Sequence, residues 1–467
     1  DSPDENSPEN AELLHWAEAQ MQNLNRRYAS VPQPLFFLLH RTAQWNEQQN
    51  VWMGYERKRG KLSMLNSWLR KPAEQFSEVH SNVISPPAGV KYVITLDSDT
   101  VLPRDTAHKL VATMAHPLNH PVYDPVKQRV VKGYGILQPG LAEEIPRNGQ
   151  GRYAAMCSNV PGNDPYSMMS SDIYQDLFGE GSFVGKGIYD VDTFTQATRN
   201  TCPENLVLSH DLLEGCYARS GLLSEVLLYE QYPNNYLTDV ARRTRWIRGD
   251  WQLLNWLKLN PRRADGTRGK NPLTTLSRWK LLDNLRRSLV APSFLVLVFC
   301  TLLLVPNPFY WICVLAAVLL LPTVLVIAQD ILNKPARRPF LQHLILVSSG
   351  GLKRLMRIGL GFITLPHEAG YSLHSIAVTL WRLGISHHNL NQWASFDQST
   401  ESAKASPVRF YRAMWLNVIA GLALILLAAF LAPMMLFVAL PVGVLWCLAP
   451  LLLSWLSREP ARASITF

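Results

Sequence analysis

The sequence predicts an α/β domain followed by about four membrane helices, and two observations carry this prediction. Over roughly the first 285 residues, short apolar runs alternate with helical patterns, as is typical of α/β proteins. Beyond them, residues 288–329 and 413–457 contain no Asp, Glu, Lys or Arg. Each stretch is about twice the ~20 residues that one helix needs to cross a bilayer, so each is expected to hold a pair of spanning helices.

Hydrophobic periodicity predicts the elements of the first part. Residues 11–28 have apolar side chains at helical spacing. Residues 34–40 (PLFFLLH) and 90–96 (VKYVITL) are short apolar runs that predict buried strands, the second one buried on both faces as in parallel sheets. The same reasoning predicts a helix at 106–116, strands at 130–137 and 223–229, and a long helix rich in Arg and Trp at 236–259.

Prolines divide each uncharged stretch into two helices, at residues 306–308 and near residue 433. Between the stretches, residues 331–412 carry ten Lys or Arg against three acids, and the positive-inside rule places such a connection in the cytoplasm. Within this connection, residues 341–365 place three basic side chains on one helical face. That pattern favours a helix lying on the membrane surface over a spanning one.

Composition and charge limit the class of protein. Charged residues make up only 17% of the chain, against about 25% in soluble domains, so a disordered chain is excluded and a purely soluble enzyme is not expected. Most of the net charge of +9 lies in the basic connection, so a membrane surface explains it without nucleic acid. The six cysteines are scattered and predict neither disulfides nor a zinc site. The predicted organisation is an α/β domain (1–286), two helix pairs (287–330 and 413–457), the basic cytoplasmic and interfacial connection (331–412) and a polar tail (458–467).

Asp97-Ser98-Asp99 places two carboxylates at the end of the predicted strand 90–96. Ligands of open α/β sheets bind at the carboxyl ends of strands. Carboxylates there suit a hard divalent cation that bridges the phosphates of a substrate. A solvated turn with an aspartate capping the next helix is the alternative. The position directly after a strand favours the metal site.

Asp211 lies in the segment SHDLLEG (209–215), at the point where a helix is expected to begin. Its side chain could cap that helix, because Asp is a preferred capping residue. It could equally act as a general base that takes the proton from an attacking sugar hydroxyl. Spacing alone does not separate these interpretations.

Residues 242–248 contain four arginines and a tryptophan within a predicted helix. A solvated basic face is the common explanation for such clustering. However, Trp246, Trp251 and Trp256 interleave with the arginines, and indole rings stack well on sugars. Arginine forks bind phosphate oxygens in bidentate fashion. The pattern therefore favours binding of a nucleotide-sugar.

Two glycine-containing segments are weaker signals. Residues 55–62 (YERKRGKL) are basic and turn-like, and Lys61 could reach a diphosphate. Residues 178–187 (FGEGSFVGKG) contain four glycines, which allow the backbone to approach a ligand closely. Neither segment fits the phosphate-loop or dinucleotide-binding pattern.

In this order the motifs resemble the catalytic core of processive inverting glycosyltransferases of the GT-A type, such as cellulose and hyaluronan synthases. That pattern is a basic Gly-Lys segment, Asp-x-Asp, a further Asp and (Gln/Arg)-x-x-Arg-Trp, followed by membrane helices. Here the third aspartate follows His210, whereas it usually follows Glu in those enzymes.

Longer phrases are similar to the glycosyltransferase region of bacterial cyclic β-1,2-glucan synthases. They cover most of residues 34–256 and read WMGYERKRGKL, YVITLDSDTVLPRDTA, MAHPLNHP, DIYQDLFGEGSFVGKGIYDVD, ENLVLSHDLLEG and RWIRGDWQLL. The resemblance implies transfer of glucose from UDP-glucose, with inversion, to a growing β-1,2-glucan. It also implies a divalent metal (Mg or Mn) and a multi-pass protein of the bacterial inner membrane whose catalytic domain is cytoplasmic. Complete members have further membrane helices and a phosphorylase-like domain, so the chain is expected to be part of a longer protein and its GT-A domain to be incomplete at the N-terminus.

The resemblance also implies residue roles. Asp211 would be the catalytic base. The other residues are assigned to the donor diphosphate (Lys61, Asp97, Asp99, Arg242, Arg245), to the metal (Asp99, Asp97) and to the acceptor (Trp246, Gly181).

Two other functions fit the sequence less well. One is synthesis of a different β-glucan, linear or cellulose-like, because no motif determines the linkage. The other is a non-catalytic membrane transporter or scaffold that binds a nucleotide. Such a protein would be expected to lose at least one of the acidic positions or part of Arg-x-x-Arg-Trp, and all are present.

Overall fold

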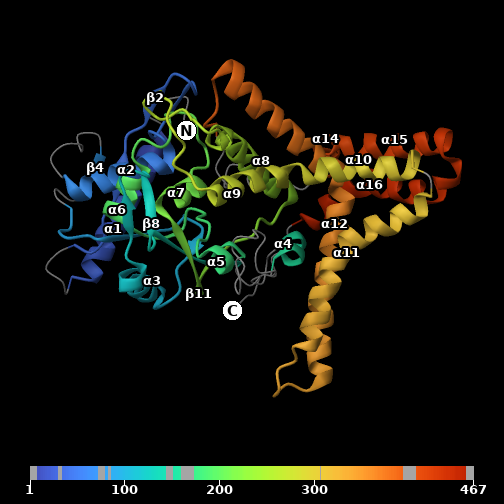
Figure 1. Ribbon diagram of the computed structural model, residues 1–467, viewed down its shortest axis with the longest axis horizontal. Coiled ribbons are helices and arrows are strands. Elements are labelled where there is room, and N and C mark those ends of the chain that lie inside the picture. Colours follow the sequence, from blue (N-terminus) through green and yellow to red (C-terminus); the bar gives the residue numbers. More distant parts are fainter. Residues whose placement is uncertain are drawn as a thin grey trace.

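A mixed α/β domain formed by the first part of the chain adjoins a group of long apolar helices formed by the last part (Figure 1). This computed structural model describes residues 8–29, 34–71, 79–81, 86–143, 151–158, 173–305, 307–392 and 406–458. The predicted class, α/β followed by apolar helices, is therefore confirmed at this coarse level.

The N-terminal elements lie outside the central sheet. Helix α1 (Pro8–Arg27) confirms the first predicted helix. The strand predicted at 34–40 is wrong for most of its length: Leu35 and Phe37 are exposed, and a strand begins only at Leu39. Asn25 of α1 bonds to the backbone of residues 35 and 36, which holds this run against α1. The remaining elements are β1 (Leu39–Arg41) paired with β4 (Val79–Ser81), β2 (Gln44–Asn46) paired with β3 (Val51–Met53), and α2 (Arg57–Arg70).

The central sheet has five strands in the order β5-β10-β9-β11-β6. Only β9 and β11 are parallel, and the other neighbours are antiparallel. The expectation of a parallel sheet is thus wrong for most pairs, in keeping with β5, which is only half-buried over most of its length. The strands are β5 (Tyr92–Thr95), β6 (Thr100–Val101), β9 (Ile136–Glu143), β10 (Gly187–Asp190) and β11 (Ser220–Glu230).

The apolar run 130–137, predicted as one strand, forms parts of two. Strand β8 (Arg129–Lys132) pairs with β7 (Val122–Asp124), and β9 begins at Ile136. The chain turns between them at Gly133, whose φ is +64°. A Cβ at Gly133 would lie 2.0 Å from the carbonyl oxygen of His120, so the turn requires glycine.

Helices cover both faces of the sheet. Neighbouring residues of a strand point to opposite faces: Leu137 and Ile188 pack with α3 (Thr106–Ala115), whereas Ile136 and Tyr189 pack with α6 and α7. The predicted helix at 236–259 ends early, as α8 (Tyr236–Gln252) followed by the 3-10 turn η2 (Leu253–Leu257). The remaining helices are α4 (Arg152–Cys157), α5 (Ile173–Phe178), α6 (Val191–Thr198) and α7 (Asp211–Ala218).

The apolar helices provide between two and four candidate membrane spans in the described residues. Two helical stretches, α11 (Pro308–Leu332) and residues 433–456, are long and apolar enough to cross a bilayer individually. Two bent pairs pass the same test together: α9 with α10, bent by 45°, and α14 with α15, bent by 69°. The bounds are α9 (Thr275–Ser288), α10 (Val290–Leu303), α14 (Pro407–Ala413), α15 (Trp415–Leu431) and α16 (Leu436–Leu456).

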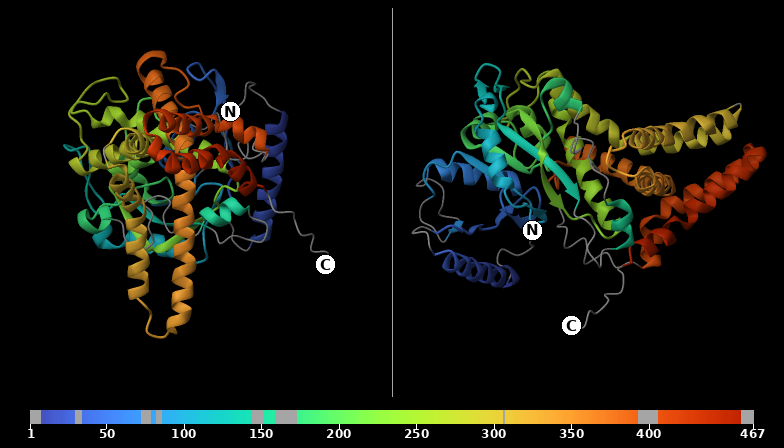
Figure 2. Two further views of the ribbon diagram at one scale, coloured as in Figure 1. Left: turned by 90° about the vertical axis from the view of Figure 1, so that its right-hand side faces the viewer. Right: turned by 90° about the horizontal axis from the view of Figure 1, so that it is seen from below.

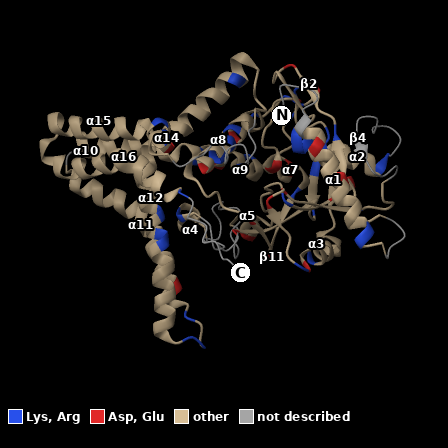
Figure 3. Ribbon diagram, turned by 180° about the vertical axis from the view of Figure 1, so that it is seen from behind, with Lys and Arg blue, Asp and Glu red and all other residues tan. Residues whose placement is uncertain are grey.

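The basic connection is dominated by a single helix, α12 (Phe340–Trp381), of 42 residues and about 63 Å. It lies beside α11 (Figure 2, left), and its first half runs across the direction of α10, α15 and α16 (Figure 1). Charged residues mark α12, whereas α10, α15 and α16 carry none (Figure 3). Helix α12 is not among the candidate spans. Its interfacial position stays a prediction.

Candidate functional site

Asp97 is the centre of an ion network at the point where three strand ends meet. It follows β5, and its Oδ1 lies 2.5 Å from the Nζ of Lys58 on α2. Its Oδ2 lies 3.1 Å from the Nζ of Lys186, which precedes β10 and also pairs with Glu230 at the end of β11. Burial alone would raise the pKa of Asp97, but Lys186 and Lys58 outweigh it and lower the pKa. The carboxylate is therefore held in its ionised form.

The lysine that reaches Asp97 is Lys58 and not Lys61. Lys61 is exposed on α2, with Arg41 and Lys58 as its charged neighbours. Gly60, between the two lysines, packs against the preceding turn, because a Cβ there would lie 2.0 Å from the carbonyl oxygen of Tyr55. This close packing orients the first turn of α2 and directs Lys58 toward β5.

Asp99 and Arg245 lie at the same end of the sheet. Asp99 is exposed, two residues beyond Asp97. Burial and Arg242 lower the pKa of Arg245, while the charges of Asp97 and Asp99 act in the opposite direction. The charges of Asp97 and Asp99 thus act on the Arg245 guanidinium, and a diphosphate site shared by these three residues stays a prediction.

Asp211 opens α7 and faces the same loop from the other side. Its Oδ1 lies 2.7 Å from where a Cβ would stand on Gly185, whose φ is +88°. The carbonyl oxygen of Gly185 accepts a hydrogen bond of 2.8 Å from Lys58, the partner of Asp97. The N-cap position of α7 is taken by His210, and the Oδ1 of Asp211, the first residue of the helix, is buried without a hydrogen-bond partner in the described structure. These facts favour the base over the capping interpretation.

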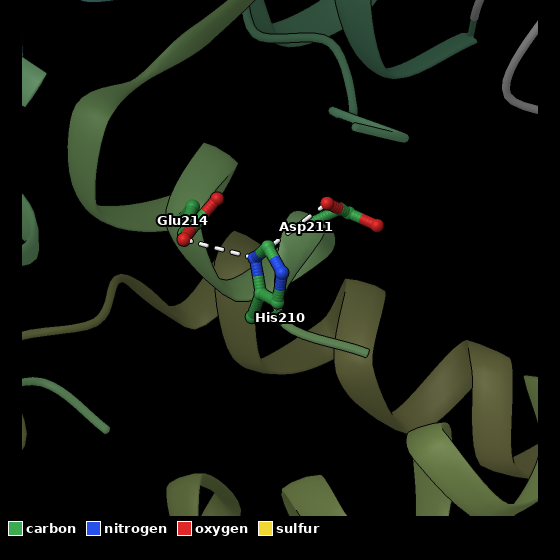
Figure 4. A group of neighbouring side chains, drawn as sticks. All are labelled: His210, Asp211 and Glu214. Atoms are coloured by element: carbon green, nitrogen blue, oxygen red, sulfur yellow. Dashed lines mark ion pairs between the residues drawn. The ribbon is translucent and has the colours of Figure 1, made fainter. Parts of the chain in front are cut away.

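His210 and Glu214 form a buried pair beside Asp211 (Figure 4). The Nδ1 of His210 lies 2.9 Å from Glu214 and 3.6 Å from Asp211. Burial would lower the pKa of His210, but Glu214 and Asp211 outweigh it and raise the pKa. In the sequence His210 stands out only as a departure from the glycosyltransferase pattern, and Glu214 is not among the predicted site residues. The spacing of four residues at a helix start was the available signal.

The arginine-rich helix α8 borders the site on the side of Asp211. Arg242 bonds to Asp239 at 2.8 Å, and its guanidinium lies 4.8 Å from the ring centre of Trp246. A Cβ at Gly249 would lie 2.5 Å from the Cβ of Ser209, so α8 packs closely on the segment that leads to Asp211.

The three interleaved tryptophans differ in exposure, and Trp246 is the most exposed of them. Trp246 is 47% exposed. Trp251 donates its indole N–H to Ser288, and Trp256 is 1% exposed within the core. Trp256 lies in the core because the chain leaves the helix at η2, and the role of Trp246 in acceptor binding stays a prediction.

Helix α12 contacts α8 through an ion network around the buried carboxylate of Asp239. Asp239 pairs with both Arg242 and Arg243, and Arg243 lies 3.7 Å from Glu368 of α12. After α12 the chain returns to the α/β domain. There the carbonyl of Leu390 accepts hydrogen bonds from Arg248 and Gln252 of α8.

Gly181 lies apart from this group. It is buried, its N–H donates to Ser220, and its carbonyl accepts a bond of 2.8 Å from Lys280 of α9. Lys280 is itself 1% exposed and also contacts Glu180. Both backbone groups of Gly181 are thus engaged within the fold, and its role in acceptor binding stays a prediction.

The predicted metal ligands fit a divalent cation unequally. Both oxygens of Asp97 are paired with ammonium groups, whereas the exposed carboxylate of Asp99 is accessible. His210, Asp211 and Glu214 offer ligand atoms within 4.8 Å of one another. The Nδ1 of His210 is already paired with Glu214 in this group. Asp99 is therefore the better candidate.

Fold and site together define a membrane-associated α/β protein with carboxylates, lysines and arginines gathered where strand ends meet. No protein-family model matches the chain. The chain is 37% identical over 465 residues, 99% of its length, to a curated protein, the cyclic β-(1,2)-glucan synthase NdvB of Rhizobium meliloti (strain 1021). The resemblance to cyclic β-1,2-glucan synthases is thereby confirmed along nearly the whole chain. The chain spans 16% of that relative's length.

Proposed function

We propose that this chain is the glucosyltransferase part of a cyclic β-1,2-glucan synthase, adding glucose from UDP-glucose with inversion to a growing β-1,2-glucan. One observation carries the proposal: Lys58 bonds to Asp97 and to the carbonyl of Gly185, and the carboxylate of Asp211 lies against Gly185. A donor-side carboxylate and a candidate base are thus held on two sides of one loop. The relationship to a named glucan synthase supplies the substrate class.

The donor diphosphate is held by the basic side chains at the end of β5. Lys58, Lys186 and Arg245 surround Asp97, and their positive charges would stabilise the negative charge that develops on the departing UDP. A Mg or Mn ion held by Asp99 would neutralise part of the same charge when bound. The GT-A assignment, like the metal, belongs to this proposal.

Asp211 is the base of the transfer step. Its carboxylate takes the proton of the acceptor hydroxyl, whose oxygen bonds to the anomeric carbon of glucose from the side opposite UDP. The bond between that carbon and the diphosphate oxygen breaks, and UDP leaves with its electron pair. One base and a stabilised leaving group are sufficient for inversion. No second carboxylate need act as a nucleophile, unlike in retaining glycosidases.

The proposal also assigns a binding surface to the acceptor sugar and a position to the apolar helices. The exposed indole of Trp246, next to Arg242, provides a stacking surface for the terminal sugar of the glucan. We place the α/β domain in the cytoplasm and the apolar helices in the bacterial inner membrane, where they would receive the polymer. The additional length of the relative leaves room for the phosphorylase-like domain expected from the resemblance.

The test is incorporation of labelled glucose from UDP-glucose by membranes that contain the chain, with and without Mg²⁺ or Mn²⁺. Asp211→Asn and Asp99→Asn are compared with the unaltered chain. We expect metal-dependent β-1,2-linked polymer that falls by at least about a thousandfold in Asp211→Asn, since an amide cannot take the proton.

Arg104→Gln is the control, because this exposed residue lies outside the site. If the chain alone is inactive, the same comparison is made in a protein extended at both ends. Unchanged incorporation in Asp211→Asn, or polymer with another linkage, would contradict the proposal.

A further inference from the structure

A cavity of about 640 Å³ lies on the α/β domain outside the transferase site. It is formed by α6, the turn between β7 and β8, the end of α7 and the chain between η2 and α9. In Figure 1, α6 and β8 lie at the end of the domain opposite to α10, α15 and α16, so this region faces away from the apolar helices. The volume is within the usual range of small-molecule sites, about 300 to 1,000 Å³.

The charged lining of the cavity is entirely basic. Arg199, Arg262 and Arg263 contribute to the wall, and no carboxylate does. Arg263 is held in place by a bond of 3.0 Å to the side chain of Gln128. In the part of the chain that the structure describes, Arg199 and Arg262 are exposed and neither forms an ion pair with a carboxylate. Two uncompensated guanidinium groups beside a third make the cavity suited to an anion.

The carboxylates on neighbouring turns are already engaged. Asp124 pairs with Lys127 and accepts backbone bonds from the same turn. Asp265 accepts bonds from Thr267 and Asn200. Asp124 is therefore balanced by Lys127, and the charge of Asp265 acts on Arg263, so neither acid is paired with Arg199 or Arg262 in the described structure.

The uncharged side chains of the cavity suit a ligand with hydroxyl groups better than a ligand with a nucleobase. Trp256 and Tyr217 form the base of the cavity but are 1% and 5% exposed, so little aromatic face is available for a nucleobase. The exposed amide of Gln196 offers a donor and an acceptor, the amide nitrogen of Gln128 a donor and the amide oxygen of Asn200 an acceptor. Amides beside arginines match the hydroxyls and the phosphate of a sugar phosphate.

We propose that this cavity binds a phosphorylated sugar at a site separate from the donor site. Arg199 and Arg262 bind the phosphate, and the amide side chains bind the sugar hydroxyls. Tyr217 lies near the end of α7, the helix that begins with Asp211, so a ligand here would contact the element that carries the proposed base. The proposal does not depend on the transferase function, because binding is measured without turnover.

The test is calorimetric titration of the purified chain in detergent with glucose 1-phosphate, inorganic phosphate and glucose. We expect saturable binding of glucose 1-phosphate, weaker binding of phosphate and none of glucose. The double variant Arg199→Gln with Arg262→Gln should weaken glucose 1-phosphate binding at least about tenfold. Both side chains are exposed and unpaired in the described structure, so its thermal unfolding midpoint should not change.

Two further variants separate this site from its surroundings. Arg104→Gln, which removes an exposed arginine elsewhere on the domain, and Asp99→Asn, in the donor site, should both bind like the unaltered chain. Absence of binding, unchanged affinity in the double variant or complete displacement of glucose 1-phosphate by UDP would overturn the proposal.

Discussion

The carboxylate of Asp97 pairs with two ammonium groups, and this arrangement prepares positive charge for a donor that carries a phosphate. Lys58 and Lys186 occupy separate oxygens of Asp97, and Lys186 is further balanced by Glu230. The carboxylates thus fix the positions of the lysines before any substrate arrives. Charges that are positioned in advance cost little reorganisation during a reaction, which makes them effective in stabilising a leaving group.

We predict that Lys58 and Lys61 differ sharply in importance. Lys58→Met should reduce glucose incorporation on the order of a hundredfold, because it removes the link between Asp97 and Gly185. Lys61→Met should change incorporation by no more than about threefold, because this exposed side chain makes no contact with Asp97 in the described structure. Equal losses in the two variants, measured at matched protein levels and unfolding midpoints, would contradict the assignment.

At the scale of residues, the sequence does not show whether Lys58 or Lys61 contacts Asp97. The basic segment, the Asp-x-Asp motif and Arg245 were recognised from residue types and order, and the structure brings them together. Which of two lysines three positions apart faces the strand depends on how α2 is rotated about its axis. That rotation is set by the contact between Gly60 and the turn at Tyr55, which no local pattern shows.

His210 predicts a pH-dependent contribution to stability. Its pKa is raised in the fold, mainly by Glu214, against the effect of burial. A raised pKa means that the folded state binds the proton more tightly than the unfolded state. The stabilisation is therefore complete below about pH 6.5, the unfolded pKa of His, and is lost as pH rises through the folded pKa.

The measurement is the thermal unfolding midpoint of His210→Gln relative to the unaltered chain, at about pH 6 and about pH 9. The difference should be largest at the lower pH and should shrink at the higher one. His108→Gln, at an exposed position of α3, is the control. A difference that stays constant or grows with pH would contradict the prediction.

At the scale of elements, the contact between α15 and α16 depends on two glycines. A Cβ at Gly443 would lie 2.6 Å from the carbonyl oxygen of Gly421, and one at Gly421 would lie 2.4 Å from that of Gly443. Small residues allow such close backbone approach between helices in a membrane, where packing replaces the hydrophobic effect as the main source of association.

We predict that Gly443→Ala destabilises the protein, whereas Gly359→Ala does not. The added methyl group at residue 443 overlaps backbone, which should cost about 1 to 3 kcal/mol. At Gly359 of α12 no atom lies within 4 Å of the added group, and alanine favours the helix. Thermal unfolding in detergent measures both, and a midpoint for Gly443→Ala equal to that of the unaltered chain would argue against this packing.

Helices and strands were predicted correctly where one hydrophobic periodicity extended over many residues. They were predicted wrongly where an apolar run was short or contained a turn. The helices of residues 8–27 and 106–115 and the division of each uncharged stretch follow from periodicity and proline, and the structure has them. The run 130–137 became parts of two strands because of the turn at Gly133. Strand direction in the sheet depends on the route of the whole chain, so an apolar run could not reveal that β5 is antiparallel to β10.

At the scale of the whole molecule, the proposed orientation makes a topology prediction. A cysteine introduced by Asn307→Cys, at the turn between α10 and α11, should react with an impermeant maleimide from the periplasmic side. Arg337→Cys, between α11 and α12, should react only after the membrane is opened. The positive-inside rule is the reason, since the basic connection is expected in the cytoplasm.

The control for labelling is Cys313→Ser in both variants, because Cys313 is exposed on α11 close to the first turn. Labelling of Asn307→Cys only in broken cells would reverse the proposed orientation. Labelling of both positions from the periplasm would require a different number of spans.

Lys280 has a consequence for how the chain can be divided. This buried lysine of α9 fixes the carbonyls of Glu180 and Gly181, and α9 leads directly into α10. Residues 178–187 of the α/β domain are therefore held by Lys280, a residue of the helix that directly precedes the first apolar helix, α10. A soluble enzyme truncated before α9 would keep every acidic motif residue yet lose this anchor. The boundary between the α/β domain and the apolar helices therefore lies at α9, and not at the end of β11, the last strand in the sequence.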